Sequence, residues 1–253
     1  MKTPIALIFD VDGTLADTER DGHRIAFNQA FTEAELNWHW SVETYGVLLN
    51  VTGGKERIRY FIKQFQPAFK PPGDLDKFIH KLHQSKTRHF VALLNSGAIP
   101  LRPGIERLLR EARSEEIRLG IATTTTPENV TALLSATLGA ESINWFEVIA
   151  AGDVVANKKP APDIYLYAMA QMNLTAADCL AFEDSENGFL SSGQSGLKTV
   201  VTVNDYTRHQ EFTGAAIVLD QLGEPGAAFS VLAGNAGTAT YVDLQMIKRI
   251  FES

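Results

Sequence analysis

The stretch that decides the fold is IALIFDVDGTLADTE, which runs from Ile5 to Glu19. Its first part, Ile5–Phe9, is a continuous apolar run, which is typical of a strand buried on both faces of a parallel sheet. The run ends on Asp10, and a second aspartate, Asp12, follows two positions later. Because ligands bind beyond the carboxyl ends of parallel strands, this ending predicts a site at that edge of the sheet.

Further apolar runs alternate with helix-length segments along the rest of the chain. We expect strands at 119–122, 147–150, 179–182, 199–203 and 216–219. We expect helices at 128–138, 163–172, 186–195 and 242–251. Strands that alternate with helices indicate βαβ units, so the sequence predicts an α/β fold with a doubly wound, Rossmann-like parallel sheet.

The segment between the first strand and Arg102 holds no comparable strand run. Its apolar residues recur at helical spacing in three groups: Ala26, Phe27, Ala30 and Phe31; Ile58, Phe61, Ile62 and Phe65; Phe78, Ile79 and Leu82. We therefore expect a helical cap domain at 16–99, inserted into a core made of 1–15 and 100–253. The hinges are expected near Leu15–Thr18 and Ser96–Pro100.

Composition limits the class of protein. The 253 residues are 45% hydrophobic, and the formal charge of -7 argues against a general nucleic-acid binder or a binder of anionic membranes. No apolar segment approaches the roughly 20 residues that span a bilayer, and the N-terminus lacks a signal-peptide pattern. The single cysteine, Cys179, excludes an intrachain disulfide and is expected to be an inert core residue. We expect a cytoplasmic monomer, or one in a similarly reducing compartment such as a plastid stroma.

Polar residues also follow two other expected strands, and a lysine pair precedes an expected helix at the same edge. The run Thr123–Thr126 follows one strand, Glu183 and Asp184 follow another, and Lys158 and Lys159 precede PAPD. Together with Asp10 and Asp12, this edge holds four carboxylates. Clustered carboxylates repel one another and tend to hold protons, so a cation is needed to keep them ionised. Mg²⁺ prefers a few carboxylates and a substrate phosphate, so the edge suits phosphoryl transfer through an aspartyl phosphate.

These motifs resemble a known set. DVDGT, the strand end at Thr123, the lysine of KKPAPD and FEDSENG are similar, in the expected order, to the four motifs of the haloacid dehalogenase superfamily. The resemblance implies that Asp10 is the nucleophile, and that Asp12 protonates the leaving oxygen and then activates water. It also implies that Thr123 and Lys159 hold the phosphoryl group, whereas Lys158 is expected to be a solvated neighbour.

The resemblance also implies a magnesium site. The ion would be held by Asp10, the backbone carbonyl of Asp12 and Asp184, with Glu183 beside it. The dehalogenases of the superfamily lack an acid at the position of Asp12, because a halide leaves without a proton, whereas a sugar alkoxide needs one. The resemblance is therefore to the phosphate-transferring members.

The expected cap resembles that of the phosphoglycolate phosphatase and β-phosphoglucomutase group, in which the cap selects the substrate. The candidate substrate-binding residues are Glu19, His23, Thr52, Gly53, Gly54, Lys55, Arg57, Thr124 and Asn129. TGGKER, residues 52–57, reads either as a second phosphate pocket at a helix start or as a plain loop that enters a surface helix. Three aromatic residues either line the pocket or, as is more usual, build the core of the cap: Trp38, Trp40 and Tyr45.

DTERDGHRIAFN, TGGKER, IATTT and KKPAPDIY resemble the CbbY-type sugar-bisphosphate phosphatases most closely. Members of that branch remove one phosphate from xylulose 1,5-bisphosphate, a side product that inhibits the carbon-fixing carboxylase. Lys55 stands where related mutases carry the arginine for the distal phosphate, but their Lys-Asn step is here Thr126-Pro127. The alternatives are a phosphosugar mutase, a phosphoglycolate phosphatase, and a phospho-accepting switch without enzymatic turnover.

Overall fold

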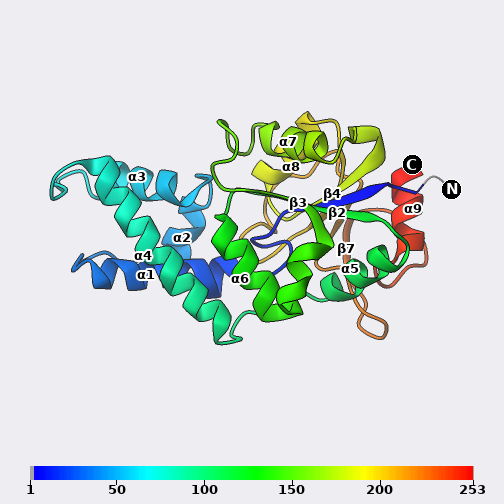
Figure 1. The fold of residues 1–253 in the computed structure, drawn as a ribbon, viewed down its shortest axis with the longest axis horizontal. Coiled ribbons are helices and arrows are strands. Elements are labelled where there is room, and N and C mark those ends of the chain that lie inside the picture. Colours follow the sequence, from blue (N-terminus) through cyan, green and yellow to red (C-terminus); the bar gives the residue numbers. More distant parts are fainter. Residues whose placement is uncertain (1–2, 253) are drawn as a thin grey trace.

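A seven-stranded sheet forms the core of the protein in the computed structural model, which describes residues 3–252 (Figure 1). The strands lie in the order β3-β2-β1-β4-β5-β6-β7. Their bounds are Ala6–Phe9 (β1), Arg118–Thr123 (β2), Phe146–Ala151 (β3), Cys179–Glu183 (β4), Lys198–Thr202 (β5), Ile217–Leu219 (β6) and Val231–Gly234 (β7). Neighbours from β3 to β6 are parallel, and β7 pairs antiparallel with β6. The predicted α/β doubly wound fold is confirmed.

The central strand β1 is apolar throughout because both of its faces are covered. Leu7 and Phe9 point into the larger hydrophobic cluster, and Ala6 and Ile8 point into a second cluster on the opposite face. All four residues are fully buried. Alternating side chains of one strand therefore contribute to two cores, which explains the absence of polar alternation.

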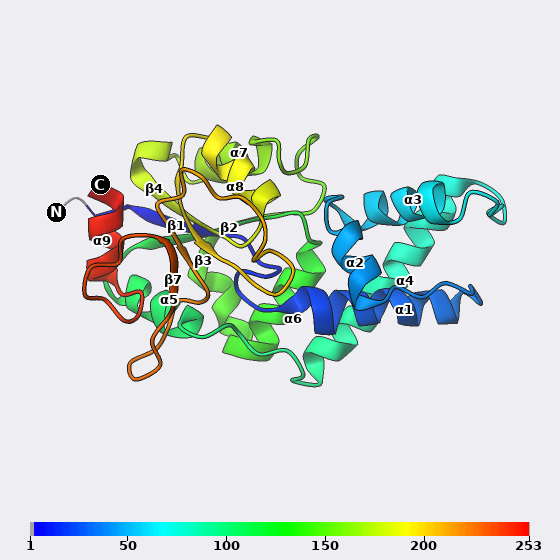
Figure 2. The same cartoon turned by 180° about the vertical axis from the view of Figure 1, so that it is seen from behind.

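Helices cover each face of the sheet (Figure 2). The first face packs against α5 (Ile105–Ser114), α6 (Pro127–Leu138) and α9 (Leu244–Glu252). The second face packs against α7 (Asp163–Gln171) and α8 (Glu186–Gln194). Two short 3₁₀ segments, η2 (Ala140–Trp145) and η3 (Ala176–Asp178), lead into β3 and β4.

The strand order reverses at β1, which lies between β2 and β4. Phe9 is in register with Ile121 of β2 and with Phe182 of β4. The backbone N–H of Asp10 extends this pairing, since it donates to the carbonyl of Phe182 at 3.0 Å. The residues that follow these three strands therefore meet at one edge, at the switch point where doubly wound sheets bind ligands.

Four helices form a separate layer beyond this edge (Figure 1). They are α1 (Arg24–Glu33), α2 (Val42–Leu48), α3 (Gly54–Phe65) and α4 (Leu75–Asn95), and a π-helical turn, η1 (Glu19–His23), precedes them. An aromatic cluster joins them, in which Trp40 is fully buried and Trp38 nearly so. The two tryptophans therefore belong to the core of this layer. We call this helical layer the cap.

The two chain segments that enter and leave the cap lie next to each other. Ala16 forms a bridge with Leu101, and the N–H of Arg102 donates to the carbonyl of Leu15 at 2.8 Å. α4 also reaches the core, where Phe90 and Leu94 share a cluster with residues of β1. The division into 1–15 with 100–253 and 16–99 remains our proposal for the two domains.

Six elements lie outside the sequence predictions. These are α2 and α5, the antiparallel edge strand β7, the π-helical turn η1 and the 3₁₀ segments η2 and η3. β7 gives no alternating signal because its residues, VLAG, are all largely exposed. Within residues 3–252, no helix combines the length and the apolar character that a transmembrane helix requires.

Candidate active site

A lysine joins two carboxylates at the ends of β1 and β4. Lys159 Nζ donates to Asp10 Oδ1 at 2.7 Å and to Glu183 Oε1 at 2.6 Å. The Tyr165 hydroxyl of α7 donates to the same Glu183 oxygen at 2.5 Å. All four side chains are buried. The candidate nucleophile is thus fixed by a cation that Glu183 and Tyr165 hold in place.

The pKa values indicate that this edge carries too much negative charge for one lysine. Burial raises the pKa of Asp10 to about 7, because the attraction of Lys159 only partly offsets it and the charge of Glu183 adds to it. Burial and the charges of Asp10 and Glu183 also raise the pKa of Asp184 well above its ordinary value. Burial alone would lower the pKa of Lys159, but Asp10 and Glu183 outweigh it and raise that pKa.

A metal ion fits this excess of charge. Asp10, Glu183 and Asp184 each offer one carboxylate oxygen, and these oxygens lie within 4.8 Å of one another. One oxygen of Glu183, Oε2, is buried without a hydrogen-bond partner among the described residues. A hard divalent cation suits such an all-oxygen set and lowers the pKa of the acids around it.

Two glycines leave room for the acidic cluster. Gly13 has a φ of +90°, and a Cβ at this position would overlap the carboxylate of Asp184. A Cβ at Gly188 would overlap the carboxylate of Glu183, so Gly188 is a packing residue. Asn204 Nδ2 donates to Asp184 Oδ2 at 2.7 Å and fixes that carboxylate from the end of β5.

The hydroxyl at the end of β2 completes a small cavity. Thr123 is buried, and its Oγ1 accepts a long hydrogen bond from the N–H of Thr125 at 3.4 Å. It lines a cavity of about 90 Å³ together with Asp10, Lys159 and Asp184. The structure therefore brings the four predicted core positions to one place.

The second aspartate of the motif turns toward the cap. Thr18 Oγ1 donates to Asp12 Oδ1 at 2.6 Å, and His23 Nε2 lies 2.8 Å from the same oxygen. Lys86 of α4 approaches the other ring nitrogen, Nδ1, at 2.7 Å. Since an ammonium group can only donate, Nδ1 accepts, and the ring proton lies on Nε2 and points to Asp12. Both bonds use Oδ1, which leaves Oδ2 for chemistry.

The electrostatics of this chain keep Asp12 ionised. Burial alone would raise the pKa of Asp12, but its contact with His23, and then those with Thr18 and Lys86, lower it well below its ordinary value. Burial lowers the pKa of Lys86 to about 8, against the attraction of Asp12 and Glu19. Asp12 is therefore ionised before any substrate is present.

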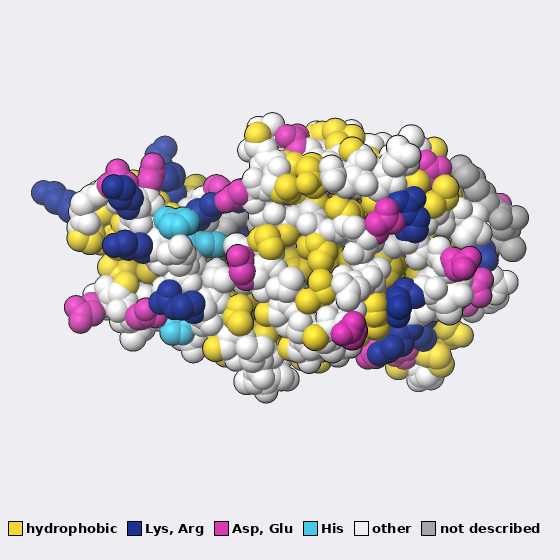
Figure 3. Space-filling view, viewed as in Figure 1, with side chains coloured by type: hydrophobic (Ala, Val, Ile, Leu, Met, Phe, Trp, Pro, Cys, Tyr) yellow, Lys and Arg dark blue, Asp and Glu magenta, His cyan; other side chains and the backbone are white. Residues whose placement is uncertain are grey.

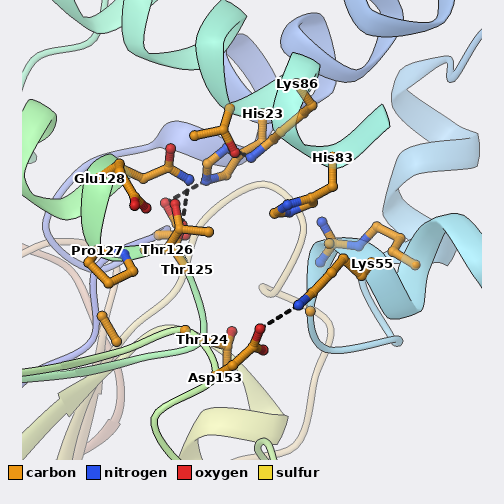
Figure 4. Close-up of a pocket in the computed structure, with 18 of the residues that line it drawn as sticks. His23, Lys55, His83, Lys86, Thr124, Thr125, Thr126, Pro127, Glu128 and Asp153 are labelled. Atoms are coloured by element: carbon orange, nitrogen blue, oxygen red, sulfur yellow. Dashed lines mark hydrogen bonds and ion pairs between the residues drawn. The ribbon is translucent and has the colours of Figure 1, made fainter. Parts of the chain in front are cut away.

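A larger cavity of about 880 Å³ lies between the cap and the core. Figure 4 shows His83 and Lys86 directed into it from the cap, opposite the threonine run of the core. Histidine and basic side chains gather on the cap where it borders the core (Figure 3). Burial, and then the charges of Lys86 and Lys55, lower the pKa of His83 to about 3. Five Lys or Arg side chains and four Asp or Glu side chains line the cavity, so an anionic ligand would bind to its cations, among them Lys55 and Lys86.

Four charged side chains link the cap to the core at the rim of this cavity. Lys55 Nζ donates to Asp153 Oδ2, and Lys158 Nζ lies 3.0 Å from Asp153 Oδ1 (Figure 4 shows the first pair). Lys158 also lies 3.3 Å from Glu56 Oε1. The prediction of a solvated Lys158 is wrong, since its side chain is only 15% exposed. The acidic partners attract it into the contact between the two layers.

The predicted ligands Glu19 and Arg57 meet at a buried tyrosine. The Tyr45 hydroxyl donates to Glu19 Oε2 at 2.5 Å, and Arg57 Nη1 donates to the Tyr45 oxygen at 2.7 Å. Arg57 Nε donates to the carbonyl of Leu48 at 3.2 Å. Tyr45 thus belongs to the cap core by its ring and to the site by its hydroxyl, so both open readings apply to it.

The remaining predicted ligands are distributed along the cavity walls. Thr52 Oγ1 accepts a hydrogen bond from Asn187 Nδ2 at 3.2 Å, which joins the cap to α8. Gly53 and Gly54 open α3, and Thr124 borders both cavities. Asn129 Nδ2 donates to Thr125 Oγ1 at 2.9 Å, and Oδ1 of Asn129 is buried without a partner among the described residues.

Several residues of the site lie outside the sequence predictions. They are Lys86, His83, Tyr165, Asp153 and Asn204, with Thr18 and Tyr45 named only as a hinge residue and an aromatic candidate. For Lys86 one signal exists, because a lysine at the spacing of Leu82 and Phe90 breaks the apolar face of α4. The others carry no local signal, since their partners are distant in the sequence.

Comparison with known proteins places these features in context. Residues 6–196 match the family model described as haloacid dehalogenase-like hydrolase. The chain is 47% identical over 220 residues to the plasmid-borne CbbY protein of Cupriavidus necator, with 87% of this chain and 86% of that protein covered. It is 49% identical over 210 residues to CbbY of Rhodobacter capsulatus, with 83% and 90% covered.

A solved structure is similar over the same length. It is an aspartate-to-asparagine variant of CbbY from Rhodobacter sphaeroides in complex with xylulose-(1,5)bisphosphate. The TM-score is 0.81 at 45% sequence identity, with 86% of this chain and 94% of that chain covered. A putative β-phosphoglucomutase from Thermotoga maritima shares the fold at 24% identity and a TM-score of 0.61.

Proposed function

The chain belongs to the haloacid dehalogenase-like hydrolase family, and on that premise we propose that it is a Mg²⁺-dependent sugar-bisphosphate phosphatase. The substrate that we propose is xylulose 1,5-bisphosphate, and the products are xylulose 5-phosphate and phosphate. One observation carries the proposal. The small cavity at Asp10 and the large basic cavity adjoin, because five residues line both: Asp12, Glu19, Gly53, Arg57 and Thr124.

Two adjoining anion sites suit a substrate with a phosphate at each end. The reacting phosphate would lie by Asp10, Thr123 and Lys159. The distal phosphate would lie among the cations of the large cavity, near Lys55 at the start of α3. The similar CbbY structure, which holds this bisphosphate, supports the choice of sugar.

We propose that Asp10, Asp184 and the backbone carbonyl of Asp12 hold the Mg²⁺ ion, with Glu183 beside it. The bonds of Glu183 Oε1 to Lys159 and Tyr165 favour this secondary position for Glu183. When bound, the ion neutralises the acidic cluster and polarises the phosphoryl oxygens. The requirement for magnesium rather than another divalent ion is part of the proposal.

The residues of the chain then divide the reaction into two steps. Asp12 takes up one proton from solvent when the anionic substrate arrives. An Asp10 oxygen then attacks phosphorus in line, the bond from phosphorus to the sugar oxygen breaks, and Asp12 delivers that proton to the leaving oxygen. Asp12, again a carboxylate, takes a proton from the attacking water, whose oxygen displaces the phosphoryl group from Asp10. The Lys159 charge stabilises the oxygens of the transferring group in both steps.

The test is a phosphate-release assay with Mg²⁺ over mono- and bisphosphorylated sugars, repeated with Lys55→Ala. We expect turnover of the bisphosphate to fall about 10–100-fold, which is the usual value of one hydrogen bond to a charged group. Monophosphates should change little. The matched control is Lys63→Ala, an exposed position on the same helix.

Two results would contradict the proposal. Equal losses for all substrates with Lys55→Ala would remove the distal phosphate from this pocket. A phosphate-shifted sugar in place of free phosphate would identify a mutase instead. We also propose that the protein is a monomer and that it resides in a reducing compartment. Light scattering of the purified protein tests the oligomeric state.

A further inference from the structure

We propose that Tyr45 and Arg57 are positioning residues that hold Glu19 as a selector for a hydroxylated carbon chain and against a carboxylate next to the reacting phosphate. The inference rests on the proposed function and deepens it. It predicts that the site accepts a sugar bisphosphate and rejects phosphoglycolate, the smaller ester on which related caps act.

Glu19 stands at the passage between the two anion sites. It is the first residue of η1, and it lines both the small cavity around Asp10 and the large basic cavity. A substrate with one phosphate in each cavity must carry its middle carbons past this carboxylate. The group that contacts Glu19 is therefore the segment between the phosphates, which in a sugar bears hydroxyls.

Tyr45 fixes one oxygen of this carboxylate. Its hydroxyl donates to Glu19 Oε2 at 2.5 Å, and its side chain is fully buried. Within residues 3–252, no side chain or backbone group is seen to donate to the other oxygen, Oε1. Burial raises the pKa of Tyr45 well above its ordinary value, so the phenol keeps the proton that it donates.

Arg57 and an aromatic frame hold Tyr45 itself. Arg57 Nη1 donates to the phenolic oxygen at 2.7 Å, and its guanidinium lies 5.1 Å from the centre of the tyrosine ring. The ring contacts Trp40 in the cap and Tyr206 in the core, with centroids 5.8 Å and 6.1 Å away. Because the Tyr45 ring is fully buried and contacts both layers, its hydroxyl holds Glu19 in this orientation when the cap covers the core.

The chemistry of a fixed carboxylate determines which substrate group is favoured and which is rejected. An ionised carboxylate only accepts hydrogen bonds, so it binds a hydroxyl and repels another anion. Arg57 lies 3.8 Å from Glu19 Oε2 and would otherwise attract a substrate carboxylate, but Tyr45 and Glu19 already engage it. Phosphoglycolate would place its carboxylate in this passage and meet like charge, whereas a sugar would place a hydroxyl there.

The experiment measures kcat and KM for xylulose 1,5-bisphosphate and for phosphoglycolate in the wild type, Glu19→Gln and Tyr45→Phe. We expect Glu19→Gln to shift the ratio of the two kcat/KM values by about 10–100-fold toward phosphoglycolate. Tyr45→Phe keeps the ring and removes one hydroxyl, and it should shift the ratio in the same direction by about tenfold. The loss for the sugar should appear in KM as well as in kcat.

Matched controls separate positioning from folding. Glu43→Gln on α2 and Tyr60→Phe on α3 make the same chemical changes at exposed sites of the cap and should leave the ratio unchanged. Thermal unfolding of each variant checks that the cap remains folded. A purely structural role of Tyr45 would lower both substrates by the same factor, and that result would overturn the proposal.

The outcomes also distinguish the two proposals. If the wild type does not hydrolyse the bisphosphate, the proposed function fails. If it does, and Glu19→Gln or Tyr45→Phe leaves the ratio where it was, the selecting role fails while the proposed function stands.

Discussion

The acidic edge of the core and the rim where the cap meets the core are built on different physical principles. At the edge, Asp10, Lys159 and Glu183 are buried and bind one another directly. At the cap, Lys55 binds Asp153, whose side chain is 60% exposed. Charges in the first set act in a low dielectric, and charges in the second are screened by water.

The difference teaches how this fold separates chemistry from selection. Buried, mutually bonded groups leave little freedom, since removing one leaves a partner charge without compensation. Partly exposed groups on a cap can change partners when a ligand arrives at small energetic cost. We therefore expect core substitutions to have large effects on all substrates, and cap substitutions to have smaller effects that depend on the substrate.

The largest effect is expected at the proposed nucleophile. Asp10→Asn keeps the shape of the side chain but removes the attacking carboxylate, so turnover should fall by at least ~10⁴-fold. Substrate binding in the presence of Mg²⁺ should persist, which calorimetry can measure. Turnover close to that of the wild type would show that Asp10 is not the nucleophile, and the distinction between a reacting core and a selecting cap would fail.

The next effect concerns the buried cation. Lys159→Met removes the charge that we propose to stabilise the phosphoryl oxygens, and kcat should fall by ~10²–10³-fold for every substrate. Steady-state kinetics with a bisphosphate and a monophosphate measures this. A loss confined to the bisphosphate would assign Lys159 to selection, contrary to the account.

A smaller effect links the two regions through pH. Lys86 has a pKa of about 8, lowered by burial, so it is charged below that pH and loses its charge above it. Neutral Lys86 no longer fixes the ring proton of His23 toward Asp12, and kcat/KM should therefore fall as the pH rises through about 8. Lys86→Arg, whose side chain does not titrate, should remove this alkaline decline. Persistence of the decline would show that another group causes it.

The smallest effect is expected at the rim between cap and core. Asp153→Asn weakens ion pairs to Lys55 and Lys158 that water screens. The free energy of unfolding should change by less than about 1 kcal/mol. Urea denaturation measures this change. A loss of stability several times larger would show that the ion pairs of Asp153 stabilise the fold, contrary to the adaptable role expected of the rim.

The same contrast explains how much the sequence predicts. The fold and the core positions follow from local patterns, because Asp10, Thr123 and Glu183 come directly after or at the end of buried strands. Parallel strands align their carboxyl ends, so position in the chain already implies proximity in space.

The cap contacts could not be read in this way. Lys158 looks like a solvated neighbour of Lys159 because Asp153 and Glu56 reach it only through the packing of cap against core. Tyr45 looks like one more core aromatic, and only the tertiary structure brings its hydroxyl to Glu19, which is 26 positions away in the sequence. Helix periodicity predicts which face is buried but not which polar atoms meet there.

The most direct test of the central claim is acid-quench mass spectrometry of the Mg²⁺-loaded protein during turnover of xylulose 1,5-bisphosphate. We expect one added phosphoryl group on the peptide that contains Asp10, both in the wild type and in the cap variant Lys55→Ala, where it forms more slowly. A phosphoryl group on any other residue, or turnover without a phosphorylated protein, would contradict the claim that the core edge alone carries the chemistry.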